Sequence, residues 1–147
     1  GREVFREHCS ACHRLEEYGT DIGSDLLALT DRSPETLLVA ILDPNRSVEP
    51  RFVAYTATTR AGRLFNGLVA AETGNGITMI DAHGVKRVFL RPDLDELAST
   101  GNSLMPVGIE TLFQRPEDLF DVIAYLRSIP RELATDPRSV NSENREE

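Results

Sequence analysis

Apolar residues recur at helical spacing near the start of the chain and again after its first thirty residues. Val4, Phe5 and His8 share one face of residues 2–9, which we therefore expect to be a helix. Residues 33–43 begin with a serine-proline pair, which is typical of an N-cap followed by proline at the first helical position. A proline directly after this segment predicts that the helix ends at Asp43.

A third helix is predicted near the end of the chain, over residues 116–129. It begins with a proline, has acidic residues in its first turn and an arginine in its last turn. Its apolar stripe consists of Leu119, Val122, Ile123 and Leu126. Residues 131–147 contain almost nothing that a core could bury, so we expect a polar tail or linker there.

The pattern between the second and third helices is different. Residues 51–60, 63–71, 76–82 and 85–90 are rich in β-branched and aromatic side chains and are separated by glycine-containing turns. Four such runs predict an antiparallel meander, curled into a small barrel or left open. We expect residues 91–100 to form a short helical turn that a glycine at position 101 ends.

The charge of the chain excludes one class of function. The net charge is −8, and no basic stripe with interleaved aromatic residues is present, which argues against a nucleic-acid-binding protein. No apolar run is long enough to cross a bilayer. Because the chain starts without an initiator methionine just before its most informative motif, we expect it to be part of a longer precursor.

That motif is Cys9, Cys12 and His13, a C-x-x-C-H sequence that contains the only two cysteines of the chain. A structural zinc site needs a fourth ligand, a thioredoxin-like pair is expected near a βαβ unit, and a disulfide this short stabilises little. Covalent haem attachment fits best, because cysteines at i and i+3 on a helical turn point the same way and the histidine follows on that face. We therefore predict one covalent haem c.

An iron with one histidine ligand needs a second axial ligand or keeps an open position. Met105, in the run SLMPVG, is the leading candidate, and a thioether there would raise the reduction potential. The alternative for Met105 is a core residue that fills a gap. Met79 is a weaker candidate because it lies in a predicted strand, and His83 or His8 would give bis-histidine ligation.

These residues resemble the class I c-type cytochromes over residues 1–50 and 103–130. GREVFREHCSACHRL is similar to that family's first helix and haem motif, SLMP to its ligand loop and PEDLFDVIAYLRSI to its last helix. The resemblance implies a mainly α, cytochrome c-like haem fold interrupted by a small antiparallel β insertion, α+β overall. It also implies that Gly1 and Phe5 pack against Val122 and Tyr125.

Two features depart from the family pattern. The family has a proline whose carbonyl accepts the N–H of the proximal histidine, and here Ser24 takes its place. The second is residues 51–102, a β insertion similar to that in haem-binding domains at the C-terminal end of large exported planctomycete and verrucomicrobial proteins. We therefore expect four parts: residues 1–50 and 103–130 forming the haem domain, residues 51–102 the insertion and residues 131–147 the tail.

The sequence thus predicts one-electron transfer, with Cys9 and Cys12 attached to the haem and His13 and Met105 on the iron. Arg46 and Arg51 are candidates for pairing with haem propionates, or plain surface charges. The resemblance implies an exported or periplasmic protein whose partner is a redox protein or an upstream dehydrogenase-like domain. Two alternatives remain: a haem enzyme or gas or redox sensor with an open distal site, and a haem-free zinc-binding interaction module. The sequence leaves the oligomeric state open.

Overall fold

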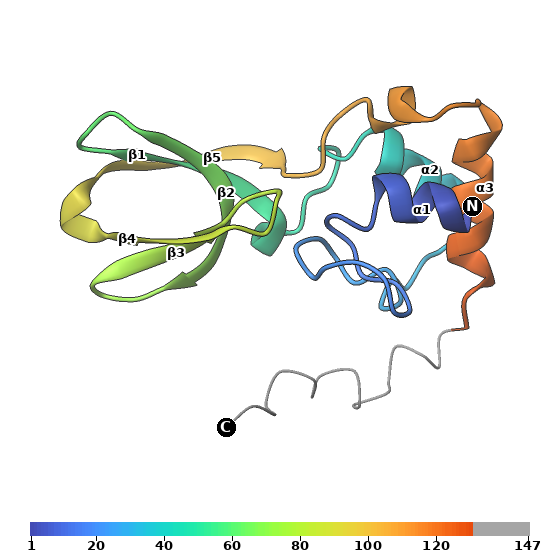
Figure 1. The fold of residues 1–147 in the computed structure, drawn as a ribbon, viewed down its shortest axis with the longest axis horizontal. Helices are drawn as coiled ribbons and strands as arrows, with labels where there is room; N and C mark the ends of the chain where they lie inside the picture. Colours follow the sequence, from blue (N-terminus) through green and yellow to red (C-terminus); the bar gives the residue numbers. More distant parts are fainter. Residues whose placement is uncertain (131–147) are drawn as a thin grey trace.

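A computed structural model describes residues 1–130 and places a group of helices beside a curled antiparallel sheet (Figure 1). The helices are α1 (Arg2–His8), α2 (Pro34–Leu42) and α3 (Glu117–Ser128), with three short 3-10 helices η1 (Pro50–Phe52), η2 (Arg91–Asp93) and η3 (Ile109–Leu112). The strands are β1 (Val53–Thr59), β2 (Leu64–Glu72), β3 (Gly76–Ile80), β4 (Lys86–Leu90) and β5 (Leu94–Ser103). The predicted tail, residues 131–147, lies outside the described residues.

The three predicted helices are all present, with ends that differ by one residue. Helix α2 begins as its sequence predicts, because the Ser33 side chain accepts a hydrogen bond from the Thr36 backbone N–H at 3.3 Å. Pro116 is the N-cap of α3, one position before its predicted place inside the helix. The predicted stripe of α3 is confirmed, since three of its four side chains are buried and Leu119 is half-buried.

Helices α1 and α3 pack against each other, and their contact forms the centre of the helical core. Phe5 and Val122 are fully buried there, and the rings of Phe5 and Tyr125 lie 6.0 Å apart. A Cβ atom on Gly1 would lie 2.7 Å from the Tyr125 Cβ, so only glycine permits this close approach. The packing of Gly1 and Phe5 against Val122 and Tyr125 is therefore confirmed.

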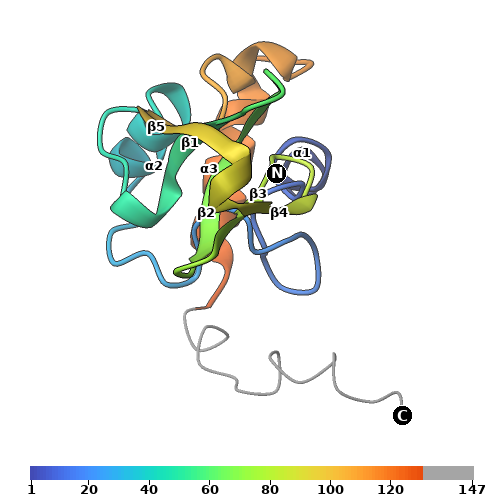
Figure 2. The same ribbon diagram turned by 90° about the vertical axis from the view of Figure 1, so that its left-hand side faces the viewer.

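The sheet has five strands in the order β4-β3-β2-β1-β5, and every neighbouring pair is antiparallel. The strands curl around a small second core of Ala57, Ile77 and Met79 (Figure 2). This core is separate from the helical one, so the β strands form a lobe of their own beside the helices (Figure 1).

The prediction of a mainly α fold was wrong. Helices account for 29% of the structure and strands for another 29%, so the antiparallel sheet is as large a part of the fold as the helices are. The helical segments are short, between 7 and 12 residues in the three α-helices, whereas β2 and β5 have 9 and 10 residues. The β segment is thus a major part of the architecture.

The prediction of a helical turn over residues 91–100 was also wrong, because strand β5 begins at Leu94 and continues through Gly101 to Ser103. The register between β1 and β5 shifts beside Asp95, since Thr58 pairs with Glu96 but Thr59 pairs with Leu94. Such a bulge adds one residue and puts Leu94 and Leu97 on the same face of the strand. Their spacing of three residues therefore imitates a helix.

The side chains of Asn45 and Arg32 connect distant parts of the chain through hydrogen bonds. The Asn45 side chain accepts the Ser103 backbone N–H at 2.8 Å, which joins the segment after α2 to the end of β5. The buried Arg32 side chain donates through Nη2 to the carbonyls of Leu126 and Ile129, the latter at 2.7 Å. Arg32 thus satisfies carbonyl groups at the C-terminal end of α3, which helices cannot satisfy internally.

Candidate functional site

The C-x-x-C-H motif forms one further helical turn directly after α1. The backbone N–H groups of Cys12 and His13 both donate to the Cys9 carbonyl, at 3.1 and 3.0 Å. Residues three and four apart on such a turn are neighbours on its surface, so Cys12 and His13 both follow Cys9 within one turn. Both cysteines are free and half-buried. The three residues of the motif are therefore neighbours on one hydrogen-bonded turn of the backbone.

Burial keeps both thiols in their neutral form. Removal from water, together with the negative charge of Cys12, raises the pKa of Cys9 to about 11. Burial also raises the pKa of Cys12. Neither cysteine therefore has the lowered pKa that is typical of a reactive thiol.

The imidazole of His13 is held by the backbone of the loop that follows it. Its Nδ1 lies 2.9 Å from the Ser24 carbonyl oxygen, and because a carbonyl only accepts, Nδ1 carries the proton. The lone pair is then on Nε2. Burial lowers the pKa of His13, while the bond to Ser24 acts in the opposite direction. The imidazole is therefore neutral, the orientation of its ring is fixed, and Nε2 carries the free lone pair.

Gly23 fixes the position of that ring from its other side. A Cβ at residue 23 would lie 2.5 Å from Cε1, 2.7 Å from Nδ1 and 2.9 Å from Nε2 of His13, so no larger residue fits. The Gly23 backbone N–H donates to the Cys12 carbonyl at 2.6 Å, which returns the loop to the motif. The sequence-based prediction noted Ser24 and overlooked Gly23, although a glycine next to it was visible in the run IGSDL.

The β lobe touches the motif through the turn between β3 and β4. The Cys12 Sγ lies 3.9 Å from the Ala82 carbonyl oxygen, and a Cβ on Gly84 would lie 3.6 Å from the Ile22 Cδ1. The Asp81 carboxylate holds this turn by accepting the backbone N–H groups of His83 and Val85, at 2.8 and 2.9 Å. Figure 1 shows the same hairpin directed from the sheet towards the helices.

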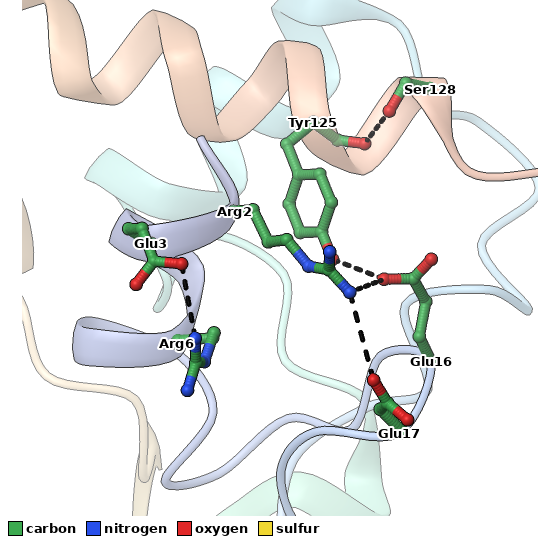
Figure 3. Close-up of polar contacts among 7 residues, drawn as sticks. All are labelled: Arg2, Glu3, Arg6, Glu16, Glu17, Tyr125 and Ser128. Atoms are coloured by element: carbon green, nitrogen blue, oxygen red, sulfur yellow. Dashed lines mark hydrogen bonds and ion pairs between the residues drawn. The ribbon is translucent and has the colours of Figure 1, made fainter.

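A polar cluster connects the motif loop to α1 and α3 (Figure 3). The Tyr125 hydroxyl donates to Glu16 Oε2 at 2.8 Å, and the Arg2 guanidinium lies 3.5 Å from the same oxygen. Burial, followed by the bond to Glu16, raises the pKa of Tyr125 to about 12. Glu16 has a positive φ of 54°, an uncommon conformation for a residue other than glycine. The cluster stabilises the loop in this tight turn.

The remaining predicted residues lie at separate places. Met105 is half-buried between β5 and η3, and its backbone N–H donates to the Ser103 hydroxyl at 3.1 Å. Arg46 is exposed. Arg51 is exposed too, lies 3.1 Å from Glu49 and stacks over the neighbouring Phe52 ring. Its guanidinium is therefore already partnered on the surface.

The three weaker candidates for an iron ligand, Met79, His83 and His8, lie in environments that differ from that of Met105. Met79 is fully buried in the core of the β lobe, which excludes it from a site at the motif. His83 is on the exposed hairpin turn with 87% of its side chain accessible. His8 lies beside the Phe113 ring, with ring centroids 5.3 Å apart.

The residues around the motif fit a haem. Two free cysteines at positions i and i+3 are followed by an imidazole whose Nε2 lone pair is free of the backbone bond, and these are the residue types that covalent haem attachment requires. Half-buried aliphatic side chains that pack against the helical core supply apolar surface in the same part of the fold; they are Leu26, Leu27, Leu29, Leu38 and Ile41.

A protein-only metal site is not formed in residues 1–130, because no three His, Cys, Asp or Glu side chains gather there in a group that could hold a metal ion. The described helices include none with the length and hydropathy of a membrane span. No protein-family model matches the chain, and no curated protein matches it either. Function has to be inferred from the site itself.

Proposed function

We propose that this chain is a one-electron-transfer domain that holds a single c-type haem through thioether bonds to Cys9 and Cys12, with His13 as an axial ligand of the iron. The observation that supports this most directly is the fixed, neutral imidazole beside two neutral thiols on one helical turn. A haem bound in this way supplies reversible one-electron redox chemistry.

The chain's own residues have defined parts in this proposal. The Ser24 carbonyl holds the Nδ1 proton of His13, which makes Nε2 the more basic nitrogen and sets the plane of the ring. Gly23 allows the backbone to approach that ring closely. The half-buried leucines near the motif exclude water, and exclusion of water tunes a redox potential.

Met105 completes the proposal as the second axial ligand. It lies on the short segment between β5 and η3, where a loop residue can present its thioether, and its side chain is only half-buried. This environment differs from that of Met79, which is fully enclosed in the β core. With His13 and Met105 both holding the iron, the haem would supply electron relay and would offer no vacant position to a substrate.

The proposal has two consequences, one for the location of the domain and one for its redox partner. Because such motifs receive their haem outside the bacterial cytoplasm, the domain functions on the exported or periplasmic side. The electron donor or acceptor is a redox partner protein or a dehydrogenase-like domain upstream in the same polypeptide. Both consequences come from the resemblance of the motif and its flanks to c-type cytochromes.

The test is expression with and without haem-maturation machinery, followed by visible spectra of the oxidised and reduced protein. The proposal requires sharp reduced bands and colour that survives acid-acetone extraction, both lost in Cys9→Ser/Cys12→Ser. A colourless protein with stoichiometric zinc would contradict it.

Met105 has a separate test. Met105→Ala should remove the weak sulfur-to-iron band of the oxidised protein and lower the reduction potential. Leu104→Ala, a substitution at the neighbouring half-buried position, should leave both unchanged. Covalent haem without that band in the native chain would mean that Met105 is not the ligand, and an open distal site would then be the better interpretation.

A further inference from the structure

A cavity of about 550 Å³ lies in the β lobe, apart from the haem-attachment motif. Its wall consists of the end of β1, the turn between β1 and β2, the start of β2, the end of η2 and part of β4. In Figure 1 the β1–β2 turn and η2 are at the end of the sheet that points away from the helices. The cavity is thus a feature of the insertion, and the haem proposal does not use it.

Three arginines line this cavity: Arg60, Arg63 and Arg87. None of them lies within 4.0 Å of a carboxylate of the described residues, whereas six other arginines of residues 1–130 form such ion pairs. Asp93 is the one acidic residue on the wall. In a chain of net charge −8, this wall therefore has an excess of two positive charges.

Two of the arginines are held in place by neighbours that carry no charge, a backbone carbonyl and an aromatic ring. Arg60 Nε donates to the Pro92 carbonyl at 2.6 Å, which fixes the guanidinium while its two terminal nitrogens stay available. The Arg87 guanidinium lies 5.2 Å from the centre of the Phe65 ring. When a guanidinium stacks on an aromatic ring, its N–H groups point outward in the plane of the guanidinium. They can then donate hydrogen bonds to an oxyanion that lies in that plane.

The rest of the wall is apolar. The rings of Phe65 and Phe89 lie 5.4 Å apart at an angle of 59°, and both belong to the cavity lining. Leu64 and Val88 also line the cavity, and each is 70% exposed. The site therefore combines aromatic and aliphatic surface with unpaired guanidinium groups.

We propose that this cavity binds a small organic anion, a molecule with an apolar or aromatic body and a carboxylate, sulfate or phosphate group. The body packs against Phe65 and Phe89, and the oxyanion accepts hydrogen bonds from Arg60 and Arg87. The volume is in the range of about 300–1,000 Å³ that small-ligand sites have. The β insertion is then a ligand-binding unit attached to the electron-transfer unit.

The experiment is calorimetric titration of the full chain with phenyl sulfate, phenyl phosphate and benzoate at low salt. Two control compounds are titrated as well: inorganic sulfate, which has the oxyanion without the aromatic body, and benzyl alcohol, which has the aromatic body without the charge. We expect at least one aryl anion to bind more tightly than either half, with an affinity that falls as salt is added. Arg87→Gln should weaken that binding about tenfold, the loss of a hydrogen bond to a charged group.

Arg51→Gln is the matched control, because Arg51 is also an exposed arginine stacked on a phenylalanine of the insertion, but it pairs with Glu49 and lies outside the cavity. Equal binding by the two variants would overturn the proposal, as would inorganic sulfate or benzyl alcohol binding as tightly as the aryl anions. Absence of binding by any aryl anion would also overturn it. Hexaglutamate is titrated in the same way, and binding by hexaglutamate without binding by any aryl anion would overturn the proposal in favour of a docking surface for an acidic protein.

Discussion

The Nδ1 atom of His13 lies 2.9 Å from the backbone carbonyl oxygen of Ser24, eleven residues later in the chain. The resemblance to c-type cytochromes implies a proline at this position. Because the acceptor is a backbone group, the serine side chain is irrelevant to the bond. The contact depends on the course of the loop, and that course is set by Gly23, which fits under the imidazole ring and bonds back to the Cys12 carbonyl.

Gly23→Ala should therefore displace the His13 ring. A Cβ 2.5 Å from Cε1 cannot be accommodated, and neither the imidazole nor the backbone beside it can move without breaking the bond to Ser24. We expect a lower yield of low-spin haem protein and a changed reduction potential, measured by visible spectroscopy and redox titration.

Gly74→Ala is the matched control for this change, because a Cβ there meets nothing within 4 Å. It should behave as the native chain does. Equal spectra and potentials for the two variants would mean that the Gly23–His13 contact has no part in haem binding.

Asp81→Ala should loosen the hairpin that contacts the motif. The carboxylate accepts two backbone N–H groups of the turn, and this is why the pKa of Asp81 is lowered, the bond from Val85 being the largest cause. Without these bonds, the turn should move away from Cys12. We expect faster hydrogen exchange of the Val85 amide and several-fold faster alkylation of the Cys12 thiol in the haem-free protein.

Asp95→Ala, an exposed carboxylate in the bulge of β5, is the control for this variant and should change neither rate. If Cys12 reacts at the native rate in Asp81→Ala, the hairpin does not protect the motif.

Much of the helical part could be predicted from the sequence, because its signals are local. A serine-proline pair begins α2, and the spacing of Val122, Ile123 and Leu126 marks the buried face of α3. Strand β5 could not be recognised in this way. Its bulge places Leu94 and Leu97 on one face at helical spacing, and only pairing with β1, some forty residues earlier, shows that the segment is a strand.

In the candidate site, too, local features could be predicted from the sequence and long-range contacts could not. The cysteines and the histidine are visible because their spacing along the chain determines their geometry. The contact of Cys12 with Ala82 joins residues that are 70 positions apart, and the bonds from Arg32 to the end of α3 join residues more than 90 positions apart. No local sequence pattern predicts these contacts. Contacts of this kind depend on how complete elements pack, which a single sequence read by periodicity does not reveal.

The two thiols should differ in reactivity before haem is attached. The pKa of Cys9 is about 11, raised first by burial, so its thiolate fraction at pH 8 is very small. In the haem-free Cys12→Ser variant we expect alkylation of Cys9 to accelerate about tenfold for each pH unit between pH 8 and 10, because only the thiolate reacts. The measurement is iodoacetamide labelling followed by mass spectrometry.

A comparison with unfolded protein completes that test. In denaturant, the thiol regains its ordinary pKa near 8.5, and the rate should approach a plateau above that pH. A plateau at the same pH in the folded protein would show that Cys9 is not protected by burial.

The start of α3 should give the protein a distinct response to acid. Asp118 is buried, and its carboxylate accepts the Arg115 backbone N–H at 3.0 Å and the Arg115 guanidinium at 2.7 Å. The side-chain bond to Arg115 is the largest cause of the lowered pKa of Asp118. A carboxyl whose folded-state pKa is below its unfolded value of about 3.9 stabilises the fold above that pH, and this contribution is lost as the pH falls through the folded-state value.

Asp118→Asn should therefore lower the free energy of unfolding at pH 7, and the difference from the native chain should shrink as the pH falls below 4. Urea unfolding of the two proteins between pH 2 and 7 measures this directly. Asp121→Asn is the control, because its carboxylate lies 3.6 Å from the same guanidinium but is half exposed, so its effect should be much smaller. A difference between Asp118→Asn and the native chain that stays constant down to pH 2 would show that Asp118 acts through its shape, with its charge contributing nothing.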